Sequence, residues 1–85
     1  MYEIYLETRA ERDLKKLEPS LFNPIITQIK KLSHEPRPNG CRKITGSKND
    51  WRIRIGNYRV IYEIDETARQ VKIMRVKHRR EAYRF

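Results

Sequence analysis

Three arginines in one predicted β-hairpin are the side chains whose spacing most clearly indicates a functional site. Gly56-Asn57 is a two-residue hairpin signal between two segments in which apolar and polar residues alternate. With these two residues as the loop, Arg54 lies opposite Arg59, and Arg52 falls on the same face of the sheet. Like charges opposed across two strands repel each other. A phosphate held between the guanidinium groups would turn this repulsion into charge-assisted hydrogen bonds, so the pattern favours an anion site over a solvated sheet edge.

The other face of the same hairpin is apolar. Because side chains alternate between the two faces of a strand, the residues between the arginines point the opposite way. We expect these residues to belong to the core, in the cross-strand pairs Ile55–Tyr58, Ile53–Val60 and Trp51–Tyr62.

The C-terminal segment 75–85 supplies a second set of candidates. It holds four arginines, a lysine, a histidine and a tyrosine within eleven residues. His78 can exchange protons near neutral pH. Tyr83 can stack on a nucleobase or hydrogen-bond to a ribose hydroxyl. The alternative is a basic tail that binds nothing in particular and contains a structural histidine.

The catalytic patterns that the sequence lacks narrow the chemistry. It has no phosphate-binding glycine loop and no nucleophile elbow, and its two histidines, His34 and His78, are far apart in the chain. We therefore expect catalysis without metal or cofactor, based mainly on cations. Cleavage of RNA suits this description, because RNA supplies its own nucleophile, the ribose 2′-OH. Fixed guanidinium groups would stabilise the charge that builds up on the five-coordinate phosphorus.

Length and charge limit the function classes. With 85 residues, the chain is expected to form one domain, 1–85, with a thin core. Of the net charge of +9, residues 39–85 carry nearly all, with thirteen Lys/Arg against five Asp/Glu. This asymmetry predicts a polyanionic partner, either nucleic acid or an acidic protein segment. No apolar run is long enough for a signal peptide or a membrane span, which predicts a cytoplasmic protein without a membrane partner.

Hydrophobic periodicity predicts two helices and then a group of strands. The first helix is expected over 9–17, with Thr8 and Glu11 as a capping box. The second is expected to begin after Ser20 or after Asn23. Strands are expected at 2–6, 42–44, 51–55, 58–64 and 71–76, the last of them central. Apart from the weak strand at 42–44, this β-α-α-β-β-β order predicts an α+β fold, with an antiparallel sheet packed against an N-terminal helical hairpin.

Two segments carry a resemblance to a known family: 51–64, with the sequence WRIRIGNYRVIYEI, and 76–84, with the sequence VKHRREAYR. They resemble the RelE branch of the RelE/ParE toxin superfamily, and the resemblance covers essentially the whole chain. It implies a twisted RelE-like sheet backed by two helices. It also implies a toxin of a type II toxin–antitoxin system, a metal-independent endoribonuclease that cuts mRNA in the ribosomal decoding site. The implied partners are a cognate antitoxin and ribosome-bound mRNA, with no DNA.

The resemblance also implies site residues. Arg52 and Arg54 match the family's pair of basic strand residues, and Arg59 matches its hairpin arginine. Arg79 matches the arginine of its last strand, and Tyr83 matches its C-terminal tyrosine. Some members have lysines at the strand pair. Arginine is a poor proton acceptor, so Arg52 and Arg54 are expected to bind phosphate and stabilise transition-state charge. Tyr83 would orient the 2′-OH or stack on a base, Arg79 would stabilise the leaving 5′-oxygen, and His78 is a candidate proton donor or acceptor.

Three other functions stay open on the same fold. One is inhibition of DNA gyrase, the activity of the ParE branch, although members of that branch lack parts of the basic-plus-tyrosine set. Another is a non-catalytic module that binds RNA or the ribosome. The third is a degenerate toxin that retains only antitoxin binding.

Overall fold

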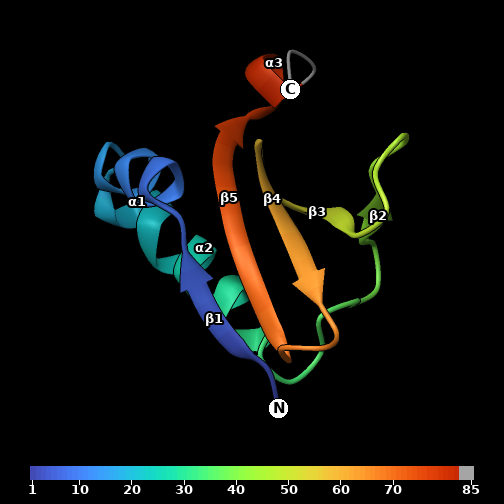
Figure 1. Cartoon of the computed structure of the whole chain (residues 1–85). Helices are drawn as coiled ribbons and strands as arrows, with labels where there is room; N and C mark the ends of the chain where they lie inside the picture. The colour runs from blue at the N-terminus through green and yellow to red at the C-terminus, as the bar shows by residue number, and fades with distance from the viewer. Residues whose placement is uncertain (83–85) are drawn as a thin grey trace.

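The computed structural model describes residues 1–82. Within them, five strands form one sheet in the order β1-β5-β4-β3-β2 (Figure 1). Helices α1 and α2 pack on one face of this sheet, and a short α3 follows β5. The elements are β1 Glu3–Leu6, α1 Thr8–Lys15, α2 Pro19–Lys31, β2 Arg42–Lys43, β3 Asp50–Ile55, β4 Tyr58–Asp65, β5 Gln70–His78 and α3 Arg79–Ala82. The predicted α+β class is confirmed, as is the order of the expected strands and helices from β1 to β5. No helix in this part of the chain is long and apolar enough to cross a membrane.

The sheet is mixed rather than wholly antiparallel. Strands β2 to β5 pair antiparallel, as expected, but β1 runs parallel to β5, with Ile4 opposite Val71 and Leu6 opposite Ile73. Only a short hairpin forces its two strands to be antiparallel. Between β1 and the later strands the chain passes through two helices, so it can re-enter the sheet in either direction. As predicted from its apolar residues, β5 is an inner strand between β1 and β4.

The starts of both helices differ from the prediction. Helix α1 begins at Thr8 itself, with Glu7 as the N-cap and no capping bond from a side chain. The Glu11 amide donates to the Glu7 carbonyl at 2.9 Å. The predicted capping box is therefore wrong, because the helix starts one residue earlier than that box requires.

Helix α2 begins at Pro19, before both predicted starts. The fixed φ of proline suits the first helical position, where no amide donor is needed. Pro24 then lies inside the helix, where it removes one internal hydrogen bond. Both Pro24 and Ser20, whose carbonyl loses that donor, are exposed, so water can take the place of the missing amide.

The core lies between the two helices and the sheet. The hairpin residues Ile53, Val60 and Tyr62 are buried in it, and the other three predicted core residues pack against it half-buried. Tyr62 is fully buried and donates its hydroxyl hydrogen to the Pro36 carbonyl at 2.7 Å. Burial raises the pKa of the Tyr62 hydroxyl far above its ordinary value. Tyr62 therefore remains a neutral donor that ties the loop after α2 to the centre of the sheet.

Tyr62→Phe is expected to lower the free energy of unfolding by about 1–2 kcal/mol, because it leaves the buried Pro36 carbonyl without its donor. Urea denaturation followed by circular dichroism measures the change. Tyr5→Phe is the matched control, since Tyr5 is 52% exposed, and it should leave the midpoint unchanged. Equal midpoints for Tyr62→Phe and the unaltered protein would show that this hydrogen bond contributes nothing.

Candidate functional site

The hairpin has the predicted register. Arg54 lies opposite Arg59, and the apolar pairs lie as expected, from Ile55 opposite Tyr58 to Trp51 opposite Tyr62. Gly56, in the loop, has a φ of 59°, a left-handed conformation that glycine adopts without strain. The local turn and the alternation along the strands therefore suffice to bring the arginines together.

By strand register, cations lie opposite one another across three neighbouring strands, β3, β4 and β5. Arg54 on β3 lies opposite Arg59 on β4, which lies opposite Lys77 on β5. We call these three residues the cation row. The ammonium group of Lys77 is paired with Glu81 of α3, with 3.3 Å between its Nζ and Oε2 of the carboxylate, and Lys77 lines a pocket with Asp13 of α1. The hairpin sequence does not reveal Lys77, because the position of this residue depends on how β5 pairs with β4.

A second line of residues, on the face of the sheet that carries Arg54, lies further from the hairpin turn. Arg42 on β2 is opposite Arg52 on β3, which is opposite Ile61 on β4. The next pairs contain acids, with Asp50 opposite Glu63. The positive part of the face thus lies toward the end of the sheet near the turn.

The three predicted strand arginines differ in accessibility. Arg54 is exposed, and Arg52 is half-buried. Arg59 is only 7% exposed, and its Nη1 donates to the Tyr58 carbonyl at 3.2 Å. The burial of Arg59 was not expected from the sequence, where it occupies a polar position of an alternating strand. Arg54 is therefore the member of the three best placed to meet a ligand, and Arg59 is held within the fold behind it.

The structure brings the start of α3 to the same end of the sheet. The Arg79 amide donates to the carbonyl of Asn57, in the hairpin loop, at 2.7 Å. The side chain of Arg79 is exposed. The backbone of Arg79 therefore lies beside the hairpin turn, and the role predicted for its side chain stays a prediction. Tyr83, the other C-terminal candidate, lies outside the described residues.

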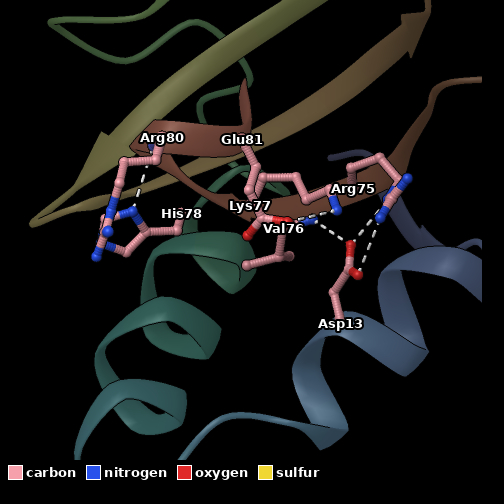
Figure 2. A network of polar contacts seen from close by, with 7 residues as sticks. All are labelled: Asp13, Arg75, Val76, Lys77, His78, Arg80 and Glu81. Carbon is pink, nitrogen blue, oxygen red and sulfur yellow. Dashed lines mark hydrogen bonds and ion pairs between the residues drawn. The ribbon is translucent and has the colours of Figure 1, made fainter. Parts of the chain in front are cut away.

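His78 lies on the other face of the sheet. It is opposite Tyr58, whose side chain packs against the core, and the two rings meet edge to face with centroids 5.4 Å apart. The Arg80 amide donates to Nδ1 of His78 at 3.3 Å (Figure 2). His78 also lines a pocket formed with the first turns of α2. The structure therefore does not bring His78 onto the face that carries the arginines.

Asp13 of α1 secures the end of β5 that carries Lys77. Figure 2 shows its carboxylate reaching from the helix to β5. Oδ2 accepts from Arg75 Nε at 2.9 Å and from the Val76 amide at 2.9 Å, while Oδ1 accepts from Arg75 Nη2 at 3.2 Å. The side chains of Asp13 and Arg75 are only 10% and 16% exposed. Asp13 was not predicted, because nothing in the local pattern of a polar helix face distinguishes it from other acids.

This network changes the pKa of Asp13. Burial alone would raise it, but hydrogen bonds from Arg75 and from the Val76 amide outweigh burial and hold the pKa below the ordinary value of 3.8. The same pairing raises the pKa of Arg75. A carboxyl whose pKa is lower in the folded than in the unfolded state stabilises the fold in its ionised form.

We therefore expect the Asp13 contribution to stability to be complete above the unfolded pKa. It should be lost progressively as the pH falls from about 4 toward the lower folded pKa. Thermal denaturation between pH 7 and pH 2 measures this loss. In Asp13→Asn, which has no carboxyl to titrate, the decline below pH 4 should be shallower. Parallel declines in both proteins would contradict this role of Asp13.

The chain is similar over most of its length to known proteins. The family described as "ParE toxin of type II toxin-antitoxin system, parDE" matches residues 4–83. Toxin RelG of Mycobacterium tuberculosis is 36% identical over 87 residues, which cover 98% of this chain and 97% of the relative. The putative toxin RelE1 of Methanocaldococcus jannaschii is 29% identical and covers 98% of this chain and 96% of the relative.

Solved structures show the same fold. The toxin–antitoxin complex RelBE2 from Mycobacterium tuberculosis contains a chain with a TM-score of 0.80 and 32% identity, covering 91% of this chain and 96% of that chain. The archaeal RelE–RelB complex from Pyrococcus horikoshii contains a chain with a TM-score of 0.81 and 25% identity, covering 92% of this chain and 94% of that chain. The similarity of fold therefore extends over more than nine-tenths of this chain.

Proposed function

Because the chain belongs to the ParE toxin family of type II toxin–antitoxin systems, we propose that it is an endoribonuclease that cuts mRNA on the ribosome and so inhibits translation. Its similarity to RelG and RelE1 makes it a RelE-like member of the RelE/ParE superfamily. That similarity favours RNA cleavage over the gyrase inhibition of the ParE branch.

The cation row is the observation that carries the proposal. An RNA phosphate above Arg54 would meet its exposed guanidinium group, with the positive charges of the buried Arg59 and of Lys77 on the next two strands. Attack by the 2′-OH on the neighbouring phosphorus forms the bond to the 2′-oxygen and breaks the bond to the 5′-oxygen, which leaves a 2′,3′-cyclic phosphate and a 5′-hydroxyl. The 2′-OH gives up one proton, the leaving 5′-oxygen takes up one, and negative charge builds on the phosphoryl oxygens in the transition state. Cations already fixed by the sheet stabilise that charge without reorganising during the reaction. Arg54 and Arg52 bind the phosphate, while Arg59, buried behind them, adds positive charge and supports the row.

The leaving 5′-oxygen and the 2′-OH are assigned to residues near the C-terminal end. Arg79, beside the hairpin turn, is proposed to stabilise the leaving 5′-oxygen. Tyr83 is proposed to orient the 2′-OH or to stack on a base. The candidate role of His78 in proton transfer stays a prediction. It requires the RNA to reach around the end of β5, since His78 lies on the opposite face from the arginines.

We further propose a cognate antitoxin as the protein partner. The solved relatives from Mycobacterium tuberculosis and Pyrococcus horikoshii are complexes of a toxin with an antitoxin. An acidic antitoxin segment would find its electrostatic complement in the strongly basic half of this chain, and by covering the cation row it would exclude RNA. Activity on translating ribosomes implies a cytoplasmic location.

Primer extension on a defined mRNA translated in vitro tests the proposed function. New 5′ ends should require both the purified protein and translating ribosomes. Protein that has been dialysed against EDTA before it is added should cut equally well. Intact mRNA, with the protein shown to be folded by circular dichroism, would reject the endoribonuclease proposal.

Gyrase inhibition is the second candidate, because the matched family description names ParE. A DNA supercoiling assay with purified gyrase distinguishes the two functions. We expect no inhibition at protein concentrations that cut ribosome-bound mRNA. Inhibition of supercoiling together with intact mRNA would make this chain a gyrase inhibitor, with the cation row as a binding surface.

A further inference from the structure

A pocket of about 280 Å³ lies where the sheet loses its last strand. Only Arg42 and Lys43 of β2 pair with β3. Within residues 1–82, the end of β3 at 53–55 therefore pairs with β4 on one side and has no strand on its other side. The lining comes from α2, from the loop before β2, from β2 and from β3, and includes Gln28, Asn39, Gly40, Arg42, Ile53 and Arg54. The pocket therefore adjoins the cation row at Arg54 and extends it toward the edge of the sheet.

A tight turn fixes one wall of this pocket. The Cys41 amide donates to the Pro38 carbonyl at 3.0 Å, which closes the four residues 38–41. Gly40 has a φ of 89°, the left-handed conformation that a type II turn requires at its third position. Asn39, the second residue of the turn, is thus presented on a preformed loop. Such a wall loses little conformational entropy when a ligand binds.

The charge of the lining suits an anion. Arg42 is opposite Arg52, so it is the diagonal neighbour of Arg54, with about 7–8 Å expected between their Cα atoms. Both side chains are exposed. At this separation the two long guanidinium side chains reach one phosphate together or two successive phosphates of a chain. No residue of the lining is acidic.

The uncharged polar groups of the lining suit a nucleobase. Gln28 and Asn39 each carry an amide with two donor hydrogens and an acceptor oxygen. Amides of this kind hydrogen-bond to the exposed edges of bases in single-stranded RNA. A nucleotide uses both halves of the lining, the arginines for its phosphate and the amides for its base. An acidic peptide would use the arginines alone, so the lining favours the nucleotide.

We propose that this pocket binds the nucleotide of the RNA that flanks the cleaved phosphate, and that its amides select the base. The proposal rests on the endoribonuclease function and deepens it. Arg54 contacts the cleaved phosphate, Arg42 contacts the next one, and the flanking base turns over the edge of β3 to meet Gln28 and Asn39.

The test measures rate and base preference separately. Purified protein is added to ribosomes translating an mRNA library with randomised codons, and the new 5′ ends are sequenced. Gln28→Ala and Asn39→Ala should weaken a base preference at one position beside the cut by about fivefold or more. Arg42→Ala should lower kcat/KM by about tenfold, the loss expected for one charge-assisted contact, and leave that preference in place.

Lys43→Ala is the matched control. Lys43 follows Arg42 on the same strand and carries the same charge, but it lies opposite Trp51, on the other face. Its removal should change neither rate nor preference by more than about twofold, whereas long-range attraction alone would make the two variants equal. Thermal denaturation establishes that every variant is folded.

Each outcome decides the proposal. Cleavage by the unaltered protein, with rate and preference unchanged in the pocket variants, would overturn the pocket assignment and leave the endoribonuclease function intact. An Arg42→Ala protein that cuts normally but is no longer neutralised by an acidic antitoxin segment would make the pocket an antitoxin contact. Absence of cleavage by the unaltered protein would overturn both proposals.

Discussion

Arg54→Ala is expected to lower the rate of ribosome-dependent mRNA cleavage by about 100-fold or more and to leave thermal stability unchanged. Arg54 is exposed, lies opposite Arg59 and lines the pocket at the edge of β3. Its guanidinium group is therefore the fixed charge best placed to meet the reacting phosphate. Single-turnover cleavage of ribosome-bound mRNA measures the effect.

Two further variants distinguish the site from general charge. Arg54→Lys keeps the positive charge but loses the planar bidentate geometry of the guanidinium, so an intermediate loss of about tenfold is expected. Lys43→Ala removes one charge from the neighbouring strand β2, on the other face of the sheet, and this variant should cut nearly normally. Full activity of Arg54→Ala would show that Arg54 does not contact the reacting phosphate.

Asp13→Asn is expected to lower the free energy of unfolding by about 2 kcal/mol and the melting temperature by roughly 10 °C. The substitution leaves the largely buried guanidinium of Arg75 without its carboxylate partner. It also weakens the hydrogen bond that the Val76 amide donates to Asp13 (Figure 2). Differential scanning calorimetry at pH 7 measures both quantities.

Glu11→Gln serves as the control for Asp13→Asn. It removes a carboxylate from the same helix, whose ion pair with Lys15 is more than half exposed at both side chains. An exposed pair of this kind contributes little, so stability should hardly change. If both variants melted at the same temperature, the contacts between Asp13 and β5 would have no special part in the fold.

The structure of the hairpin was predictable because its loop, its register and its two faces each depend on residues that are close in sequence. Gly56-Asn57 sets the loop, the loop sets the register, and the alternation of side chains then assigns each residue to a face. The opposition of Arg54 and Arg59 and the apolar core face follow from these rules, and the structure confirms them. The β-α-α-β-β-β order likewise follows from changes in hydrophobic period along the chain.

Other local predictions were wrong because several sequence signals compete over a few residues. Thr8 offered a capping box, and Ser20 and Asn23 offered helix starts, yet α1 begins at Thr8 and α2 at Pro19. Propensity does not settle such cases, since a helix is stabilised mainly by packing of its apolar face. The contacts of the helices with the sheet therefore select among nearly equivalent starts.

The sequence by itself determined the hairpin, its arginines, the resemblance to RelE-like toxins and the charge asymmetry. Only the tertiary structure decided that Lys77 completes the cation row, that Arg59 is buried and that His78 faces the helices. It alone also decided that Asp13 holds β5, 62 residues away in the chain. The physical reason is that periodicity records which face a residue occupies within its own element. Which elements meet, and in what register, depends on burying all the apolar faces together, and no single segment encodes that.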